Sequence, residues 1–359
     1  MKVLFLSRAT LYSVFGGDTV QVDATARYLR QLGVEVDIRL CNETIDYGAY
    51  DLLHIFNVIR PADTIRHVRA SGKPYVLSTI YVDFSEYEKR SRKGLAGLAT
   101  RLLRRDQQEY LKAILRGVLN GERIQSPEYW WLGHRKAVQQ LAKGAAVLLP
   151  NSGSEYERFS RDYQIHKDYQ IVYYGLDETV FRRPEEVAPR EDDLVICVAR
   201  IEGKKNQLNL IRALNGTGYR LLLIGEPAPN HKRYYEACRA EAGSNVQFEG
   251  FVPQDQLYRY YQRAKVHVLA SWNETCGLSS LEAGYYGCQI VITDKGDTRE
   301  YYRDHAWYCD PADPESIRSA IEAAAAAPIT NHLRTAVRQQ FNWNQAALDT
   351  LAAYKTILQ

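Results

Sequence analysis

Short apolar runs alternate with amphipathic stretches along the whole chain. The first run, Lys2 to Ser7, leads through a turn at Gly16 and Gly17 into apolar residues at helical spacing up to Leu32. Comparable apolar runs are Val34 to Leu40, Asp51 to Phe56, Tyr75 to Thr79 and Ala146 to Leu149. Because runs that are apolar on both faces are typical of central parallel strands, the N-terminal half is predicted to be a doubly wound sheet.

The alternation starts again after residues 177–193, which contain Pro184 and Pro189 and show no clear periodicity. We interpret this stretch as an interdomain linker. The strands predicted beyond it are Leu194 to Val198, Arg220 to Ile224, Val246 to Phe248, Val266 to Leu269 and Ile290 to Thr293. The helices predicted there are Asn206 to Leu214, Tyr234 to Ala242, Leu257 to Ala264, Leu278 to Tyr286 and Pro314 to Ala326.

The pattern as a whole predicts an α/β protein with two Rossmann-like, doubly wound parallel-sheet domains in tandem. The N-terminal domain is expected at residues 1–176 and the C-terminal domain at residues 194–342. A last amphipathic stretch, residues 343–359, is expected to be a helix that packs back on the N-terminal domain.

The amino-acid composition argues against a nucleic-acid-binding, metal-binding or membrane-spanning protein. The 359 residues are 45% hydrophobic, and 46 Lys and Arg against 43 Asp and Glu leave a charge of +3, so we expect no nucleic-acid partner. The six cysteines form no C-x-x-C pair, which favours a reduced, metal-free, cytoplasmic protein. The N-terminal apolar run is interrupted by Arg8 and is interpreted as a strand, and no run is long enough to span a bilayer.

The segment ETCGLSSLE, Glu274 to Glu282, carries the most informative chemistry. A helix that opens at Gly277 would direct the amides of Gly277, Leu278 and Ser279 toward an anion such as a diphosphate. Glu282, about one turn further in, is placed to accept hydrogen bonds from a ribose diol. Glu274 precedes the helix and is a candidate for contact with sugar hydroxyls, although a pair of helix-flanking surface glutamates is the alternative reading.

Two glutamates separated by seven residues, between a buried strand and a helix, resemble the hallmark of glycosyltransferase family four, the glycosyl transferases group 1. That resemblance implies the GT-B fold, with two Rossmann-like domains facing across a cleft. Arg200 and Lys205 are similar to the family's cations after the first strand of the C-terminal domain, where they would neutralise the donor diphosphate. The turn FEGFVP resembles the family's nucleobase turn, which implies donor contacts at Phe251 and Val252.

The N-terminal half carries weaker signals of the same family. FGGDTVQ resembles the family's glycine loop, which implies that Gly17 and Asp18 contact the donor. Many relatives have a histidine after the fourth strand, where this chain aligns Tyr81. Tyr81 and Asp83 are therefore candidates for sugar contact or acceptor positioning, and an ordinary loop tyrosine and aspartate are the alternative.

Residues 89–105 contain seven Lys or Arg and no acidic residue, interleaved with leucines at helical spacing. This composition fits an interfacial helix on the inner face of a membrane, or else a solvated surface. Peripheral membrane contact would suit an anionic lipid-linked acceptor. Tyr129, Trp130 and Trp131 either stack on a saccharide or belong to the core.

The resemblance implies a retaining glycosyltransferase that needs no metal or other cofactor. It would move a sugar from a nucleoside-diphosphate sugar to a hydroxyl of a saccharide or lipid-linked saccharide in polysaccharide or glycan assembly. A non-catalytic sugar-nucleotide or glycan-binding protein on the same fold is the main alternative. A dinucleotide-dependent oxidoreductase ranks last, because the first turn lacks G-x-G-x-x-G.

Overall fold

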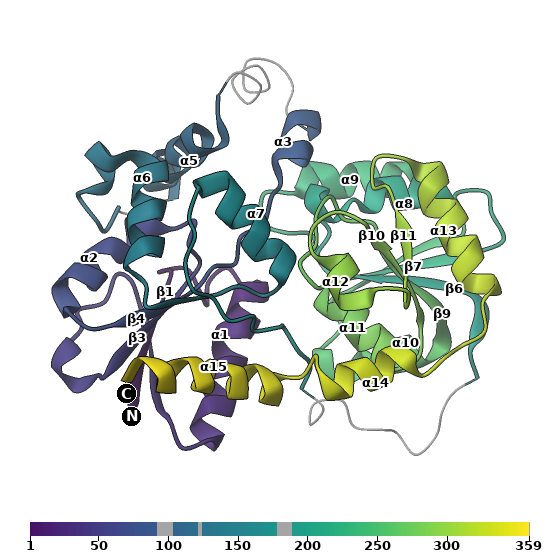
Figure 1. The fold of residues 1–359 in the computed structure, drawn as a ribbon. Helices are drawn as coiled ribbons and strands as arrows, with labels where there is room; N and C mark the ends of the chain where they lie inside the picture. Colours follow the sequence, from purple (N-terminus) through teal and green to yellow (C-terminus); the bar gives the residue numbers. More distant parts are fainter. Residues whose placement is uncertain (92–102, 121–123, 178–188, 359) are drawn as a thin grey trace. The chain divides into compact units, whose positions relative to one another are not determined.

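The structure is a computed structural model that describes residues 1–91, 103–120, 124–177 and 189–358 (Figure 1). It divides into two units. Unit 1 comprises Met1–Tyr81, Arg92–Tyr174 and Trp343–Gln359, and unit 2 comprises Val82–Ser91 and Gly175–Asn342. No helix among the described residues is long and apolar enough to cross a membrane.

Unit 1 is built on a five-stranded parallel sheet with the strand order β2-β1-β3-β4-β5. Its strands are β1 (Lys2–Ser7), β2 (Glu35–Leu40), β3 (Leu52–Phe56), β4 (Tyr75–Ser78) and β5 (Val147–Leu149). Its described helices are α1 (Gly17–Gln31), η1 (Tyr47–Ala49), α2 (Pro61–Ser71), α5 (Arg105–Asn120), α6 (Tyr129–Gly144), α7 (Gly153–Tyr163) and α15 (Trp343–Leu358). All five residues of β3 are buried, as expected for a central strand covered on both faces.

The C-terminal helix α15 packs against α1 within unit 1. Its Tyr354 is fully buried, and the tyrosine hydroxyl lies 2.5 Å from Nδ1 of His54 on β3. Desolvation lowers the pKa of His54 to about 3, so this ring is neutral in the folded protein. The last helix of the sequence therefore completes the core of the first sheet.

Unit 2 contains a six-stranded parallel sheet with the order β11-β10-β9-β6-β7-β8. Its strands are β6 (Glu191–Val198), β7 (Arg220–Ile224), β8 (Val246–Gly250), β9 (Ala264–Leu269), β10 (Gln289–Thr293) and β11 (Trp307–Cys309). Its described helices are α3 (Ser85–Ser91), η2 (Gly203–Lys205), α8 (Gln207–Leu214), α9 (Lys232–Glu241), η3 (Gln254–Gln256), α10 (Tyr258–Arg263), α11 (Leu278–Tyr285), α12 (Thr298–Tyr302), α13 (Pro314–Ala326) and α14 (His332–Gln339).

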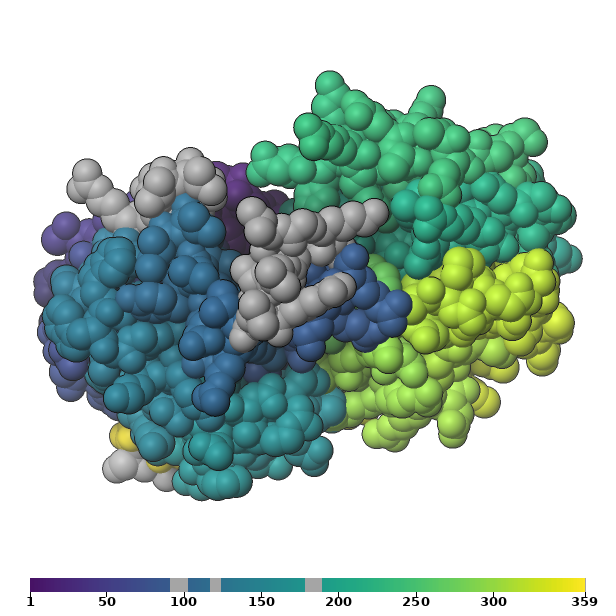
Figure 2. All heavy atoms as spheres, turned by 90° about the horizontal axis from the view of Figure 1, so that it is seen from above, coloured from purple at the N-terminus to yellow at the C-terminus, as the bar shows by residue number. Residues whose placement is uncertain are grey.

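The predicted fold class is confirmed, since both halves are doubly wound parallel sheets and each predicted strand is present. Strand β11, which the sequence pattern did not predict, adds an edge of three residues beside β10. Residues 82–91 follow β4 of unit 1 in the chain but pack with unit 2, as Figures 1 and 2 show for α3.

Strand order fixes where ligands bind in such sheets. The chain leaves β6 toward β7 and β8 and then returns to β9 on the other side of β6, so the loops after β6 and β9 diverge at a switch point. In unit 1 the equivalent switch point lies between β1 and β3. Ligands of doubly wound sheets bind in the crevice outside the carboxyl ends of the strands at this point.

Candidate functional site

Lys205 and Glu274 meet at the switch point of unit 2. Lys205 follows β6 and Glu274 follows β9, and the lysine Nζ donates a hydrogen bond to Glu274 Oε1 at 2.6 Å. The side chains are 27% and 8% exposed, respectively. Desolvation lowers the pKa of Lys205, but the charge and hydrogen bond of Glu274 outweigh it and hold that pKa above its usual value. The lysine therefore stays charged at the mouth of the site.

The loop that carries Glu274 is held by its backbone. The Glu274 N–H donates to the Lys295 carbonyl at 3.2 Å, and the Glu274 carbonyl accepts from the Asp297 N–H at 2.9 Å. Gly296 lies against this carbonyl with φ of +96°, and a Cβ there would come within 2.0 Å of the Glu274 oxygen. Only glycine permits this approach, so the DKGD turn fixes the position of the glutamate.

Helix α11 presents its N-terminus at the same edge of the sheet. Gly277 precedes the helix with φ of +63°, and the buried Tyr302 hydroxyl donates to the carbonyls of Cys276 at 2.6 Å and Gly277 at 3.1 Å. The first-turn amides of Leu278 and Ser279 have no carbonyl four residues earlier within the helix. This start therefore combines available N–H donors with the positive end of the helix dipole, as an anion site requires.

Glu282 lies one turn into α11 and is 6% exposed. Its carboxylate accepts hydrogen bonds from the Tyr261 hydroxyl at 2.7 Å and from Gln254 Nε2 at 3.1 Å. Desolvation by burial raises the pKa of Glu282 to about 7, against the lowering effect of those two bonds. Gln254 follows the exposed Phe251 and the half-buried Val252, so its bond ties the predicted nucleobase turn to α11.

Arg200 lies on the loop between β6 and η2, where its exposed guanidinium is 3.3 Å from Glu202. The loop brings Arg200 and Lys205 to the same edge of the sheet from positions five residues apart. Among the described residues there is no group of three or more His, Cys, Asp and Glu side chains arranged to hold a metal ion. All six cysteines are buried free thiols.

In unit 1, Arg8 organises the glycine loop. Its guanidinium contacts both carboxylate oxygens of Asp18 at 2.6 and 3.0 Å and also donates to the carbonyls of Thr10 at 2.6 Å and Val14 at 2.8 Å. The Asp18 carboxylate is thus engaged by a buried arginine, and the structure gives it the role of holding the loop. Gly17 begins α1, and no atom lies within 4 Å of where its Cβ would be, so the space above it is open.

Tyr81 and Asp83, the two residues predicted to contact sugar or to position the acceptor, both have hydrogen-bond partners within the protein. Tyr81 is 1% exposed, packs edge-on against Phe159 and donates its hydroxyl to Asp162 at 2.8 Å. We therefore correct the prediction that the Tyr81 side chain contacts sugar, because it is a core residue. Asp83 accepts the Ser85 N–H at 2.9 Å and so shapes the start of α3 within unit 2.

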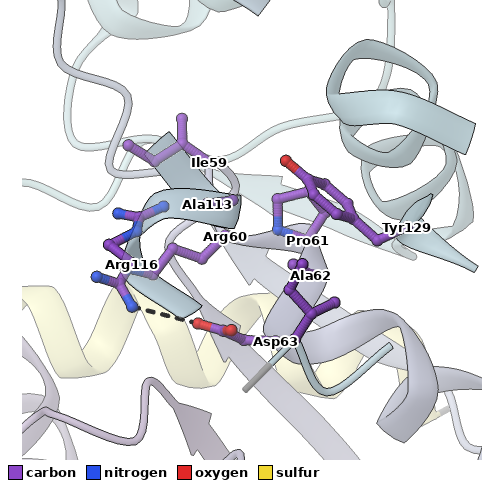
Figure 3. Close-up of a pocket in the computed structure, with 9 residues that line it drawn as sticks. Ile59, Arg60, Pro61, Ala62, Asp63, Ala113, Arg116 and Tyr129 are labelled. Atoms are coloured by element: carbon purple, nitrogen blue, oxygen red, sulfur yellow. Dashed lines mark hydrogen bonds and ion pairs between the residues drawn. The ribbon is translucent and has the colours of Figure 1, made fainter. Parts of the chain in front are cut away.

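A pocket opens beside the carboxyl end of β3 in unit 1, with a volume of about 330 Å³ that includes its mouth. Figure 3 shows Arg60 and Arg116 pointing toward the same space from the start of α2 and from α5. The Arg60 guanidinium is 3.3 Å from the Asp63 carboxylate. The other lining residues are Ile59, Pro61, Ala62, Ala113, Ile124 and Tyr129. Two cations and one carboxylate give the pocket a net positive lining.

The aromatic residues that begin α6 divide between core and surface. Tyr129 is fully buried, whereas Trp130 and Trp131 are exposed. Most of the basic stretch 89–105 and of the predicted linker lies outside the described residues. The membrane contact of that stretch therefore stays a prediction.

Sequence reasoning missed two residues that hold the donor site together and a third that orders the loops after β4 and β5 in unit 1. Tyr302 fixes the start of α11, Gln254 links the nucleobase turn to Glu282, and Glu155 accepts the N–H groups of Tyr81 at 2.6 Å and Asn151 at 2.7 Å. Glu155 follows Ser152 by three residues, and this spacing is a helix-start signal that would have placed α7. For Tyr302 and Gln254 the sequence offers no comparable signal.

Two doubly wound units, the second with an ion pair and a helix start at its switch point, are the architecture of the GT-B class of α/β proteins. Residues 180–340 match the family model described as "Glycosyl transferases group 1". Most of unit 2 is therefore similar to that family.

Individual relatives extend the same comparison. A D-inositol 3-phosphate glycosyltransferase of Kribbella flavida is 28% identical over 246 residues, which cover 61% of this chain and 58% of that protein. The chain spans about half the length of the first curated relatives it matches.

Solved structures agree with the fold over nearly the whole chain. Sucrose-phosphate synthase from Thermosynechococcus elongatus has a TM-score of 0.76 at 16% identity, covering 99% of this chain and 98% of its own. The Anabaena protein HepE in complex with UDP and glucose has a TM-score of 0.65 at 14% identity, covering 99% of this chain and all of its own. These likenesses confirm the predicted GT-B fold.

Proposed function

We propose that this protein is a glycosyltransferase that moves a sugar from a nucleoside-diphosphate sugar to a hydroxyl of a saccharide or lipid-linked saccharide. The observation that carries the proposal is the Lys205–Glu274 ion pair at the switch point of unit 2, on the same sheet edge as the start of α11. A cation, free helix amides and a buried carboxylate are the groups that a sugar diphosphate needs. The family match over this unit supports the same class of ligand.

The predicted donor-site residues of unit 2 then have separate roles. Arg200, Lys205 and the amides of Gly277, Leu278 and Ser279 neutralise the diphosphate and the charge that grows on it as the sugar leaves. Glu274 accepts hydrogen bonds from the sugar hydroxyls and Glu282 from the ribose diol. These last roles suit buried carboxylates, since a site built to pair with hydroxyls rejects ligands that lack them.

The nucleobase lies at Phe251 and Val252 in this proposal, and the family resemblance adds Gly17 as a contact of the donor phosphate. The exposed Phe251 ring offers a face for stacking, and the space open above Gly17 admits a phosphate. Because protein cations and amides neutralise the phosphates, the proposed reaction requires no divalent ion. Retention of anomeric configuration is proposed from the family resemblance, with the leaving phosphate accepting the proton of the attacking hydroxyl.

The acceptor binds in unit 1, and the pocket beside β3 supports an acceptor that carries a phosphate or another anionic group. Arginine pairs such as Arg60 and Arg116 suit phosphate oxygens. One relative is named for D-inositol 3-phosphate, a phosphorylated compound. Surface polysaccharide or lipid-linked glycan assembly is the pathway class that fits such an acceptor.

The first test is thermal denaturation with UDP, GDP, ADP and their common sugar conjugates in the presence of EDTA. A ligand at 100 times its dissociation constant stabilises by about 2.7 kcal/mol, which raises Tm by several degrees. Lys205→Ala and Glu274→Ala should abolish that rise and donor turnover, while Lys232→Ala, an exposed lysine on α9, should leave both unchanged. Normal turnover in the first two variants contradicts the site assignment.

A double variant separates binding from folding. Lys205→Ala alone leaves the Glu274 carboxylate without its buried partner, which costs up to about 3 kcal/mol of stability. In Lys205→Met with Glu274→Gln no buried charge is left, so stability should return while nucleotide binding stays lost. Nucleotide binding by the wild type without any donor hydrolysis or transfer would favour the non-catalytic sugar-nucleotide-binding protein.

The acceptor pocket is tested by kinetics once a phosphorylated acceptor is found. Arg116→Gln and Arg60→Gln should raise the acceptor KM about tenfold or more and leave the donor KM unchanged, because each removes a phosphate contact in unit 1 only. Arg69→Gln, whose exposed guanidinium pairs with Glu128, is the matched control. Equal acceptor KM values in all three variants would place the acceptor elsewhere.

A further inference from the structure

Helix α3 and the residues just before it lie on three loops of the donor site in unit 2. Lys204 Nζ sits 4.1 Å from the centre of the Phe84 ring, and the Arg90 guanidinium lies 5.3 Å from the Trp272 ring. Lys295 Nζ is 3.9 Å from the Glu86 carboxylate. Residues 82–91 therefore contact the loops after β6, β9 and β10 together.

Two of these loops are joined directly beneath α3. The Trp272 N–H donates to the Lys204 carbonyl at 2.9 Å, so the loop after β9 is bonded to the loop after β6. Lys205 and Glu274, the partners of the ion pair, are one and two residues from this bond. The Tyr87 ring lies 6.3 Å from the Trp272 ring, on the same junction. A shift of the junction moves both ends of the ion pair.

Tyr87 also leaves no room for a side chain at Gly203. A Cβ on Gly203 would lie 2.2 Å from the Tyr87 Oη and 3.0 Å from its Cζ, and the three nearest atoms all belong to Tyr87. Gly203 is not among the residues with positive φ, so its backbone conformation is open to other residues. The glycine is required for the close approach of Tyr87 and not for the turn itself.

We propose that α3 is a brace that sets the geometry of the Lys205–Glu274 pair, with Tyr87 as its positioning residue. The inference rests on the function proposed above. The brace comes from the chain between β4 and α5, both of unit 1, so the acceptor half of the sequence supplies an element that holds the donor pair. Donor turnover then depends on the packing of α3 against these loops, because α3 positions Lys205 and Glu274, which bind the diphosphate and its sugar.

The clash at Gly203 gives a specific test. Gly203→Ala pushes against Tyr87 and should lower kcat/KM for donor turnover at least tenfold, and Tyr87→Ala should lower it about threefold to tenfold by removing the brace contact. In the Gly203→Ala/Tyr87→Ala double variant the three atoms nearest to the methyl group are gone, so the activity should equal that of Tyr87→Ala alone. Gly218→Ala, where a Cβ meets no atom within 4 Å and φ is ordinary, is the matched control in both backgrounds.

A second variant distinguishes a direct loss of turnover from misfolding. Tyr87→Phe removes the Oη that lies closest to the added Cβ, so Gly203→Ala/Tyr87→Phe should recover most of the loss if Gly203→Ala alone is unstable. Thermal denaturation of each variant shows whether a loss of turnover is a loss of fold. An equal effect of Gly203→Ala in the wild-type and Tyr87→Ala backgrounds overturns the proposal, since the methyl group would then act on its own loop. No effect of Gly203→Ala overturns it as well.

Hydrogen exchange separates this inference from the proposed function. Tyr87→Ala should increase amide exchange in residues 203–206 and 271–277 and leave residues 216–219 unchanged. If the wild type binds no nucleotide and this increase is still seen, the brace stands and the proposed function fails. If the wild type binds and turns over a donor while exchange in Tyr87→Ala is unaltered, the brace is wrong and the function stands.

Discussion

Glu282 couples the stability of unit 2 to pH. Desolvation raises its pKa from 4.5 to about 7, so the folded state favours the protonated acid. The stability that Glu282 contributes is fully present below the pKa of this glutamate in the unfolded chain. It is lost as the pH rises through about 7, and the loss amounts to about 3 kcal/mol. We expect Tm of the wild type to fall by several degrees more between pH 5 and pH 8 than Tm of Glu282→Gln.

The control for this prediction is Glu236→Gln, because Glu236 is exposed on α9. That variant should follow the wild type across the same pH range. If ribose hydroxyls donate to Glu282, the carboxylate form binds nucleotide better, so affinity should rise from pH 6 to pH 8. Glu282→Gln should weaken binding and remove this rise, and an unchanged rise would contradict the ribose contact.

Single residues were predictable from sequence where a motif fixed them to an element. Glu274 and Lys205 follow two strands of a doubly wound sheet, so their meeting follows from strand order once both strands are recognised. Tyr81 was misjudged because its partners are set by packing, while the predicted ligand contacts of Asp18 and Asp83 stay predictions. A carboxylate that binds a buried arginine ten residues away looks the same in sequence as one that awaits a ligand.

The loop between β1 and α1, residues 9–16, is held by the Arg8 side chain. Arg8→Ala removes the bonds to Asp18, Thr10 and Val14 and leaves the half-buried Asp18 carboxylate with only the Thr19 N–H, which costs up to about 3 kcal/mol. We expect amide exchange to increase across this loop and donor turnover to fall about tenfold. Nucleotide affinity should change little, because the nucleotide contacts proposed above lie in unit 2 apart from Gly17.

Two further variants serve as controls for the Arg8→Ala experiment. Arg39→Ala breaks an exposed pair with Glu43 on the same unit and should have no effect on the loop. Arg8→Ala/Asp18→Ala removes both charges, so stability should recover while the loop stays mobile and turnover stays low. Full recovery of turnover in the double variant would show that the loop needs no clamp.

Elements were predicted well where hydrophobic periodicity was strong. Arg220 to Ile224 and Pro314 to Ala326 have the predicted bounds, because a buried run and an N-terminal proline mark them clearly. Strand β11 was missed because three residues, two of them only partly buried, carry no period. The placement of α3 was not predictable at all, since its partners follow β6, β9 and β10, more than a hundred residues later.

At the scale of the whole molecule, the chain forms two units with separate sheets, and the last helix belongs to the first of them. Each sheet has its own buried strands, so unfolding of one unit need not carry the other with it. A substitution of a buried residue in α15 should therefore destabilise unit 1 and leave unit 2 unchanged. A hydrophobic pattern at residues 343–359 predicted this helix, but its partner could be inferred only from a resemblance and not from periodicity.

Tyr354→Ala tests this division. Tyr354 is fully buried and contacts His54 through its hydroxyl, so truncation should cost unit 1 about 3 to 5 kcal/mol. Calorimetry should show one transition moved to lower temperature, and hydrogen exchange should assign it to residues of β1, β3 and α1. Nucleotide should still raise the other transition by the wild-type amount. Leu348→Ala, 40% exposed on the same helix, should move neither, whereas a common shift of both transitions in Tyr354→Ala would mean that the two units unfold as one.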